Sequence, residues 1–276
     1  MDSPVVQAVM LGVLQGLTEF LPVSSSGHLA LAQQMIPGFK QPGVLLDVVL
    51  HVGTMLAACA YFRREIYGII LSIPKMLGSE LETEQDQARR LLMGIIIASL
   101  PTAVIGLFLE ERAEALFASV TAVGAALVLT GAVLIAGEAV GQRRPAKAGN
   151  PGAGASFWIG VAQGIAVVPG LSRSGATISM ARGLGVGREE AARFSFLAAL
   201  PAVSGAALLS ALKHAEEIRA FSGEQIIAYL AGPLVAAAVG YAAIAVVMRM
   251  IKGGTLQWFA VYCLVLGAIS IALGSR

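Results

Sequence analysis

The chain has 276 residues, of which 57% are hydrophobic and only 13% are charged, and its mean hydropathy is +0.78. A soluble domain carries about 25% charged residues, so this composition excludes a soluble protein and predicts an all-α integral membrane protein. The net charge of +2 argues against nucleic acid as a partner, and two widely separated cysteines predict neither a disulfide framework nor a thiolate metal site.

The first apolar stretch, residues 4–36, is broken in its middle by a polar run from Gln15 to His28. A spanning helix needs about 20 mostly apolar residues, so each half is too short to cross a bilayer. We therefore expect a re-entrant helix–loop–helix hairpin, which enters and leaves by one face. Burying its carboxylate, hydroxyl and imidazole groups costs on the order of several kcal/mol unless they are paired. The polar run is thus the first indication of a functional site.

The rest of the chain contains six full-length apolar segments and a second broken one, residues 156–184, which predicts another hairpin. The predicted spans are residues 43–62, 88–109, 117–137, 190–212, 224–248 and 255–273. Asp47 and His51, four residues apart on the first span, are expected to form a structural or supporting pair. Four glycines of the later spans are expected to serve close helix packing, namely Gly124, Gly131, Gly205 and Gly240.

An internal repeat relates the two hairpins. Residues 12–16 (Gly-Val-Leu-Gln-Gly) match residues 160–164 (Gly-Val-Ala-Gln-Gly), and at the same offset the Ser-Ser-Ser-Gly at 24–27 falls on the Ser-Arg-Ser-Gly at 172–175. The single membrane domain, residues 1–276, therefore divides into repeat 1 (about 4–137), a linker (about 138–155) and repeat 2 (about 156–273). Because each repeat contains three spans, the second should be upside down. This inverted-topology repeat predicts that the hairpin tips meet near the bilayer midplane.

Basic residues in the loops predict the orientation. The face with more of them carries Arg63, Arg64, Lys75, Arg89, Arg90, Arg143, Arg144, Lys147, Arg249 and Lys252. The opposite face carries Lys40, Arg112, Lys213, Arg219 and Arg276. Cytoplasmic loops carry an excess of Lys and Arg, so the first face is expected in the cytoplasm and both termini outside.

The tip of the second hairpin has the features of an anion site. Arg173 adds a permanent planar cation, and a half-helix starting nearby would point its positive dipole end into the turn, which suits phosphate oxygens. The turn also offers backbone N–H groups and hydroxyls, contributed by Gly170, Ser172, Ser174 and Thr177. Alternatively, Arg173 pairs structurally with Glu19 or Asp47, and the two interpretations are compatible when no substrate is bound.

The tip of the first hairpin supplies groups that can react. Glu19 lies four residues after Gln15, so both share one face if the helix runs through them. Three serines at 24–26 follow a proline, and His28 comes shortly after them. A serine beside a histidine and a carboxylate is the pattern of an activated nucleophile. Serines at helix N-termini are also common caps, so capping remains an alternative for each.

The run from Gln15 to His28 (Gln-Gly-Leu-Thr-Glu-Phe-Leu-Pro-Val-Ser-Ser-Ser-Gly-His), together with Pro-Gly-Leu-Ser-Arg-Ser-Gly-Ala-Thr at 169–177, resembles the undecaprenyl pyrophosphate phosphatases of the bacitracin-resistance family. The resemblance covers the whole chain in length and span pattern. It implies a multi-pass enzyme of the bacterial inner membrane that hydrolyses undecaprenyl (C55) diphosphate to undecaprenyl phosphate and inorganic phosphate. This reaction recycles the lipid carrier for peptidoglycan synthesis and confers bacitracin resistance.

The resemblance also implies roles for single residues. Ser25 is the expected nucleophile or phosphate-contacting hydroxyl, and Arg173 is expected at the reacting phosphates. Glu19 and His28 are the expected acid–base pair, with Glu19 as a metal ligand. Substrate binding is expected from Gln15, Ser24, Ser26, Gly170, Ser172, Ser174 and Thr177. Family members need a divalent cation, so Mg²⁺, or another such as Ca²⁺, is the expected cofactor. The family also has Glu at the position of Gln15, and Gln removes that possible metal carboxylate.

Two mechanisms and one rival function stay open at this point. Either Ser25 or a water positioned by it attacks the terminal phosphorus, while the prenyl tail lies in the bilayer or in a groove between spans. The active site is expected to open to the periplasm, and a homodimer is left open. The rival is a lipid-phosphate flippase using the same Arg173 anion site, because inverted repeats with broken helices are the architecture of secondary transporters.

Overall fold

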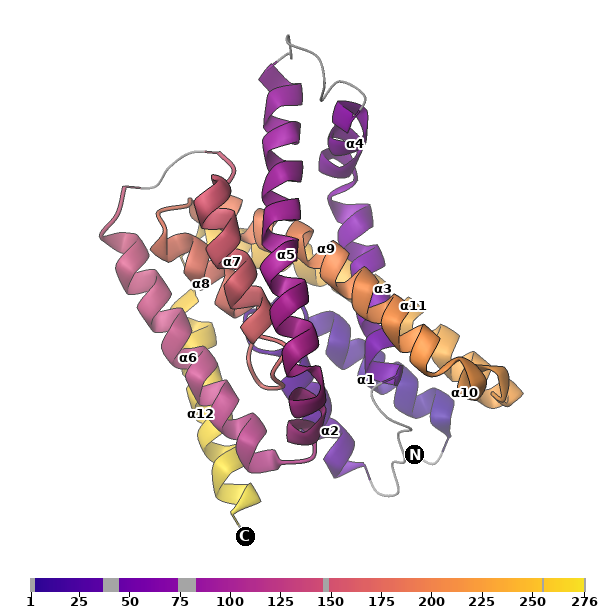
Figure 1. Cartoon of the computed structure of the whole chain (residues 1–276). Coiled ribbons are helices and arrows are strands. Elements are labelled where there is room, and N and C mark those ends of the chain that lie inside the picture. Colours follow the sequence, from indigo (N-terminus) through magenta and orange to yellow (C-terminus); the bar gives the residue numbers. More distant parts are fainter. Residues whose placement is uncertain (1–2, 37–44, 74–82, 146–148, 255, 276) are drawn as a thin grey trace.

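The computed structural model describes residues 3–36, 45–73, 83–145, 149–254 and 256–275, and within these ranges the chain forms helices α1 to α12 (Figure 1). Five of them are long and apolar enough to cross a membrane, namely α5 (Thr83–Phe117), α6 (Val120–Gln142), α9 (Arg188–Lys213), α11 (Gly223–Lys252) and α12 (Leu256–Gly274). A sixth span results if α3 (Leu45–Tyr61) and α4 (Arg63–Ser72), which meet at a 77° bend, count as one. The prediction of an all-α integral membrane protein is confirmed.

The six predicted spans correspond to these helices with shifted ends. The predicted span 88–109 lies inside α5, which begins at Thr83 and continues to Phe117. The predicted span 43–62 corresponds to α3, and its first two residues, like Thr255 of the last predicted span, lie outside the described residues. After α9, the five-residue helix α10 (Ala215–Arg219) leads into α11, which begins with a capping box between Ser222 and Gln225.

The two broken stretches form pairs of short helices. Residues 4–36 contain α1 (Pro4–Thr18) and α2 (Ser25–Met35), and residues 156–184 fall on α7 (Ala153–Ile165) and α8 (Arg173–Gly183). The longest of the four, α1, has 15 residues and cannot cross a bilayer alone. Each pair turns at the Gly-, Pro- and Ser-containing tip that the sequence predicted.

The first helix of each hairpin packs against a span from the other half of the chain. α1 lies along α11, and α7 lies along α5. A Cβ atom at Gly12 would collide with the carbonyl of Gly232, and one at Gly160 would collide with the carbonyl of Ala98, so these backbones touch. Each hairpin therefore packs on a span of the other half of the chain, so the two halves interlock. The inverted topology of the repeat stays a prediction.

The span glycines do not all have the expected packing role. Gly124 and Gly131 approach α12, and Gly240 approaches Phe20, so a side chain at these three positions would meet neighbouring atoms. The prediction is wrong for Gly205, because a Cβ atom there meets none of the described residues within 4 Å. Gly205 therefore faces open space.

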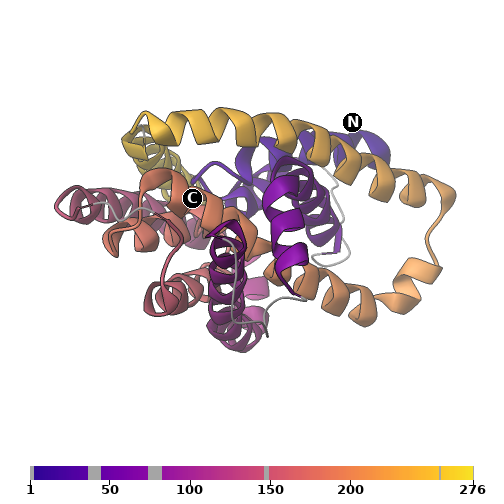
Figure 2. The same cartoon turned by 90° about the horizontal axis from the view of Figure 1, so that it is seen from above.

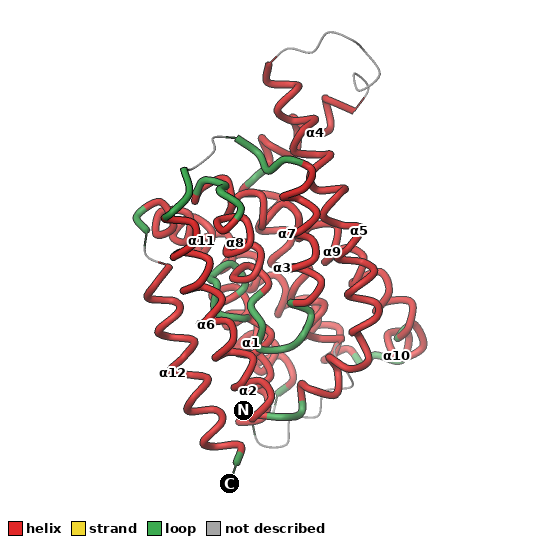
Figure 3. The backbone as a smooth tube through the Cα atoms, turned by 60° about the vertical axis from the view of Figure 1, so that its left-hand side comes forward, coloured by secondary structure: helices red, strands yellow, loops and turns green. Residues whose placement is uncertain are grey.

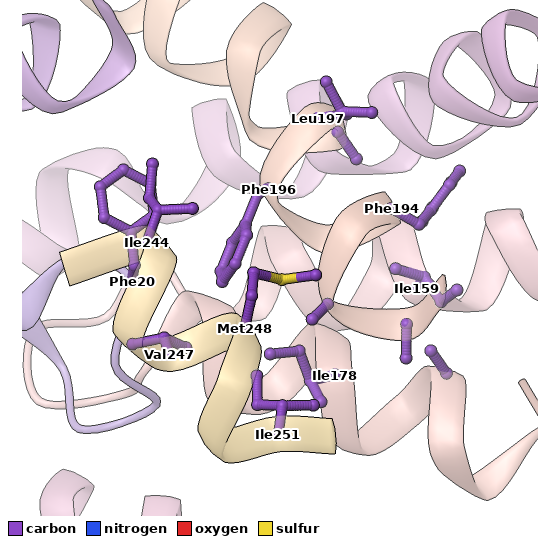
Figure 4. Close-up of a cluster of buried hydrophobic side chains, with 14 of the residues drawn as sticks. Phe20, Ile159, Ile178, Phe194, Phe196, Leu197, Ile244, Val247, Met248 and Ile251 are labelled. Atoms are coloured by element: carbon purple, nitrogen blue, oxygen red, sulfur yellow. The ribbon is translucent and has the colours of Figure 1, made fainter. Parts of the chain in front are cut away.

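The largest hydrophobic core lies next to the first tip, where α8, α9 and α11 come together. Figure 4 shows Phe20 near Phe196 of α9 and Ile244 of α11, with Ile178 of α8 beside Ile251 in the same cluster. The rings of Phe20 and Phe196 pack edge to face with centroids 5.3 Å apart. This packing holds the residue that directly follows Glu19.

The two termini lie at the same end of the molecule, and α4 with the start of α5 projects from the opposite end (Figures 1 and 3). Seen from above, the gold helix α11 runs along one side and α5 and α9 lie on the other, with the indigo first hairpin between them (Figure 2). The basic residues Arg63, Arg64, Arg89 and Arg90 belong to the projecting end. These four of the ten residues that predicted the orientation therefore lie at the end away from the termini, and two others, Lys75 and Lys147, lie outside the described residues.

Candidate active site

The tip of the first hairpin depends on an unusual backbone conformation at Ser24. Its φ is +69°, and among the described non-glycine residues it alone has a positive φ. Such a conformation costs about 1–3 kcal/mol and persists where its surroundings hold it. The Ser24 hydroxyl caps α2 by accepting a hydrogen bond from the N–H of Gly27 at 3.2 Å. The turn brings the Ser25 hydroxyl back to Glu19, the C-cap residue that follows α1.

The tip of the second hairpin is tied to α6. Gly170 has a φ of +90°, and a Cβ there would press on Val123 and Ala126 of α6, so glycine suits this position on both counts. Thr130 donates a hydrogen bond to the carbonyl of Gly170 and accepts one from the N–H of Ser172, both at 3.0 Å. The Ser172 hydroxyl in turn caps α8. These hydrogen bonds anchor the tip to α6.

The two tips meet inside the bundle. Ser174 donates a hydrogen bond to the carbonyl of Leu21 at 3.1 Å. The guanidinium of Arg173, the first residue of α8, donates to Oε1 of Glu19 at 2.6 Å and to the carbonyl of Ser195 at 3.3 Å. The contact that the sequence suggested between Arg173 and Glu19 is present.

Glu19 is the centre of the polar cluster and is only 7% exposed. Its Oε1 accepts from Arg173, while its Oε2 accepts from the hydroxyl of Ser25 at 2.6 Å and from Nε2 of Gln15 at 2.9 Å. His51 Nε2 lies 3.3 Å from the same Oε2. Because Arg173, Ser25 and Gln15 all donate hydrogen bonds to it, the arrangement suits an ionised carboxylate. It also leaves Glu19 ready to accept the Ser25 proton.

His51 contributes to this cluster in a way that sequence reasoning missed. The expected partner was Asp47, but His51 Nδ1 bonds the backbone carbonyl of Asp47 at 2.7 Å, and the Asp47 carboxylate accepts from Gln33 instead. The imidazole of His51 is therefore held by the backbone of its own helix and lies beside the Glu19 carboxylate. The only signal in the sequence was a histidine four residues from an aspartate inside an apolar span.

His28 lies away from Glu19. Its Nδ1 is 2.7 Å from the carbonyl of Ser24, and its Nε2 is 2.7 Å from the hydroxyl of Tyr262 on α12. The two rings are parallel within 4°, with centroids 5.6 Å apart. His28 is absent from the described residues that line the adjacent cavity. In this arrangement His28 holds the strained Ser24 in place.

The expected binding residues divide into two groups. Gln15 and Thr177 are fully buried; the Thr177 hydroxyl bonds Ser195 and the backbone of Arg173, and Oε1 of Gln15 has no hydrogen-bond partner among the described residues. Gly170 packs against α6 and does not line the cavity. The others line a cavity together with Glu19, Ser25 and Arg173, namely Ser24, Ser26, Ser172 and Ser174.

The cavity has a volume of about 650 Å³, within the range of small-molecule sites. Its walls are the two tips and parts of α3, α5, α7 and α9. Charged and hydroxyl groups gather where the tips meet, around Glu19 and Arg173. An anionic ligand fits this part of the cavity, since Arg173 lies at the positive N-terminal end of α8.

The described residues contain no group of three His, Cys, Asp or Glu side chains that could hold a metal ion. Oxygen donors are nevertheless present, because the Glu19 carboxylate lies beside the unpartnered Oε1 of Gln15 and the hydroxyl of Ser25. Mg²⁺ is usually held by one or two carboxylates together with water and substrate phosphates. The donor set therefore fits a Mg²⁺ shared with a phosphate substrate.

Comparison with known proteins gives consistent results. A family model described as bacitracin resistance protein BacA matches residues 8–269. The undecaprenyl-diphosphatase of Syntrophotalea carbinolica is 44% identical over 97% of this chain and 98% of its own. Undecaprenyl-diphosphatases of Desulforapulum autotrophicum (43% identical, 97% of this chain and 98% of that one) and Desulfosudis oleivorans (41%, 98% and 99%) are similar over nearly their whole lengths.

Proposed function

This chain belongs to the bacitracin resistance protein BacA family, and we propose that it hydrolyses undecaprenyl diphosphate to undecaprenyl phosphate and inorganic phosphate, the activity for which its relatives are named. The observation that carries this function is the cluster of Glu19, Ser25 and Arg173, which places a base, a hydroxyl and a cation within 2.6 Å contacts at one end of the cavity. The names of the relatives favour hydrolysis over a lipid-phosphate flippase.

Arg173 binds the diphosphate in this mechanism. Its guanidinium has five N–H donors, and its contacts with Glu19 and Ser195 occupy only part of them, so further donors are available to phosphate oxygens. The backbone N–H groups at the start of α8 and the hydroxyls of Ser172 and Ser174 line the same part of the cavity. Fixed donors of this kind stabilise the negative charge that phosphoryl transfer spreads over the oxygens.

Ser25 is the proposed nucleophile. Glu19 takes the proton of the Ser25 hydroxyl as the Ser25 oxygen bonds to the terminal phosphorus, and the bond from that phosphorus to the bridging oxygen breaks. Undecaprenyl phosphate leaves with the bridging oxygen. Water then displaces the phosphoryl group from Ser25, the proton on Glu19 returns to the serine oxygen, and inorganic phosphate leaves. In the variant mechanism a water held by Ser25 attacks directly, with Glu19 as the base.

Mg²⁺, or another divalent cation such as Ca²⁺, is the proposed cofactor, and Glu19 with the Oε1 of Gln15 would hold it alongside the substrate phosphates. Such an ion would neutralise phosphate charge. The cation would leave the roles of Ser25 and Arg173 unchanged, because neither residue is proposed to hold it. Ser25 would contact the phosphates through its hydroxyl and Arg173 through its guanidinium.

The bacterial inner membrane is the proposed location, with the active site open to the periplasm. The cavity extends from the tips to Lys213 and His214 at the end of α9. This part of the molecule lies toward the end that holds the termini in Figure 1, away from the basic loops. Because basic loops mark the cytoplasmic side, a cavity that reaches toward the opposite end supports periplasmic access.

The test is phosphate release from undecaprenyl diphosphate by the purified protein in detergent, where transport has no meaning. We expect release by the wild type and a loss of about a hundredfold or more in Glu19→Gln and Ser25→Ala. Ser204→Ala, an exposed serine on α9, is the matched control and should behave as the wild type. A folded wild-type protein that releases no phosphate would exclude the enzyme, and near-normal turnover by Ser25→Ala would exclude the serine nucleophile.

A further inference from the structure

A second cavity, which we call the α6–α8 groove, lies between α6, α7 and α8. It has a volume of about 600 Å³, and its walls are mostly apolar. Four large side chains that line it are about half exposed, namely Leu129, Val140, Trp158 and Ile165. Because α6 is a membrane span, exposed apolar side chains at this depth face lipid hydrocarbon. The groove is therefore open to the chains of the bilayer.

The groove lies in the half of the membrane next to the basic end of the molecule. Its residues on α6 run from Leu129, near the middle of the span Val120–Gln142, to Val140 close to its end. Arg143 and Arg144 follow α6 directly. This end of α6 lies toward the end from which α4 projects, away from the termini (Figure 1). In the proposed orientation the groove therefore faces the cytoplasmic leaflet.

Arg143 and Arg144 give this end of the groove a positive charge. Gly183 and Leu184, at the end of α8, line the groove. A Cβ atom at Gly185, the next residue, would lie 4.0 Å from the Cβ atom of Arg144. Both arginines are exposed, and neither guanidinium forms a hydrogen bond or ion pair with another residue that the structure describes. Their N–H donors are therefore available to an anion at the end of the groove.

The acidic residue of α6 does not cancel this charge. Glu138, the only acidic residue in the sequence of α6, is 3% exposed. Its Oε1 accepts hydrogen bonds from Arg188 and Gln142, and its Oε2 lies 3.7 Å from Nε of Arg182. Two guanidinium groups thus surround one buried carboxylate, so the two exposed arginines keep their positive charge for a ligand.

We propose that the α6–α8 groove binds an anionic phospholipid of the cytoplasmic leaflet, with one acyl chain in the groove and the phosphate on Arg143 and Arg144. Basic residues beside a gap between membrane helices on the cytoplasmic side suit anionic headgroups. At about 30 Å³ per heavy atom, the share of one water molecule in the liquid, the groove holds about 20 heavy atoms, the size of one acyl chain. Trp158, near the start of α7, fits a position at the membrane interface.

The bound chain would lie against the back of the catalytic tip. Leu171 and Ser172 line both the groove and the active-site cavity, so the second tip separates the two. Thr130, which anchors this tip through hydrogen bonds with Gly170 and Ser172, also lines the groove. A chain that fills the groove therefore packs behind the turn that carries Arg173 and supports its position.

Native mass spectrometry of the full-length protein in detergent, titrated with phosphatidylglycerol, measures this site without turnover. Phosphatidylcholine with the same acyl chains has no net charge, so it should bind about tenfold more weakly. Arg143→Gln combined with Arg144→Gln should weaken phosphatidylglycerol binding about tenfold. Arg63→Gln with Arg64→Gln, the same loss of charge from exposed residues of α4, is the matched control and should leave it unchanged. Equal affinity of the wild type for both lipids, or equal weakening by both double variants, would overturn the proposal.

A second pair of variants tests the groove itself. Ala136 is exposed and lines the groove, whereas Ala139 is exposed on the same helix outside the lining. Ala136→Trp should fill the groove and lower phosphatidylglycerol binding about tenfold or more, and Ala139→Trp should bind as the wild type. Unchanged binding in Ala136→Trp would overturn the groove as the site. Tighter binding of undecaprenyl phosphate than of phosphatidylglycerol at the same arginines would overturn the phospholipid as its occupant.

The support of the tip is measured as phosphate release from undecaprenyl diphosphate, and this part rests on the proposed function. Phosphatidylglycerol should raise kcat of the wild type about twofold or more and leave kcat of Ala136→Trp unchanged. A wild-type kcat that bound phospholipid does not alter would overturn the support of the tip. Phospholipid binding by a folded protein that releases no phosphate would contradict the proposed function while upholding the site, so the two failures are distinguishable.

Discussion

Arg173 and Glu19, 154 residues apart in the chain, form an ion pair at 2.6 Å where the two hairpin tips meet. The side chains of both residues are largely buried, so neither charge would be stable there without the other. The pair joins the hairpin that carries the hydroxyl nucleophile to the hairpin that carries the anion site. A complete active site therefore exists only when both halves of the chain have folded against each other.

The geometry of Arg173 predicts that a positive charge at this position is not enough for full catalytic activity. Arg173→Lys keeps the positive charge but loses the planar fork that reaches Glu19, Ser195 and the phosphates at once, so kcat should fall about a hundredfold or more. Steady-state phosphate release measures this effect. Arg219→Lys, in an exposed ion pair with Glu216, is the control and should retain full activity. Wild-type kcat in Arg173→Lys would show that only charge matters.

The contacts of His28 predict that it acts through the shape of the tip. Tyr262→Phe removes the hydrogen bond to His28 Nε2, and His28→Gln removes the imidazole that holds the Ser24 carbonyl. Both changes should lower kcat by loosening the same turn, so their effects in the double variant should be less than additive. Tyr262→Phe combined with His51→Gln should be closer to additive, because His51 contacts Glu19 directly. If the effects of Tyr262→Phe and His28→Gln on kcat were additive, His28 would have a role other than holding the turn.

The surroundings of Gln15 predict a change in cation requirement. Chelation with EDTA should abolish phosphate release, and Mg²⁺ or Ca²⁺ should restore it. Gln15→Glu adds a second carboxylate next to Glu19, so the Mg²⁺ concentration for half-maximal activity should fall. Titration of each metal-free protein with Mg²⁺ measures this concentration. Gln163→Glu, the equivalent change in the other hairpin, is the control. Full activity in EDTA would contradict the cofactor proposal.

Close packing of α7 on α5 predicts a large cost for one added methyl group. Gly160→Ala would press a Cβ against the carbonyl of Ala98, which should destabilise the protein by about 1–3 kcal/mol. Gly154→Ala on the same helix meets none of the described residues within 4 Å, so it should be neutral or slightly stabilising. Thermal unfolding of both variants in detergent makes the comparison. Equal stability of the two would mean that α7 and α5 separate at low cost.

Several features of the site were predictable because they depend on local sequence. A break of Gly, Pro and Ser in an apolar run predicts a hairpin wherever it occurs, and both hairpins are present. For Arg173 the sequence offered an ion pair with Glu19 or Asp47 as an alternative, because a charge inside a membrane needs a partner, and the structure shows that the partner is Glu19. The prediction for Gly205 failed, because a glycine in a sequence pattern can face either a touching backbone or open space.

The sequence by itself determined the membrane class, the two broken hairpins and the residue types that gather at their tips, since hydropathy and turn chemistry act over a few residues. Only the tertiary structure decided which imidazole contacts Glu19. The turn at Ser24, with its positive φ, directs His28 toward Tyr262, and packing of α3 beside the tip brings His51 to the carboxylate. Sequence spacing places a side chain on a helix face, whereas the atom opposite it depends on which helix packs there.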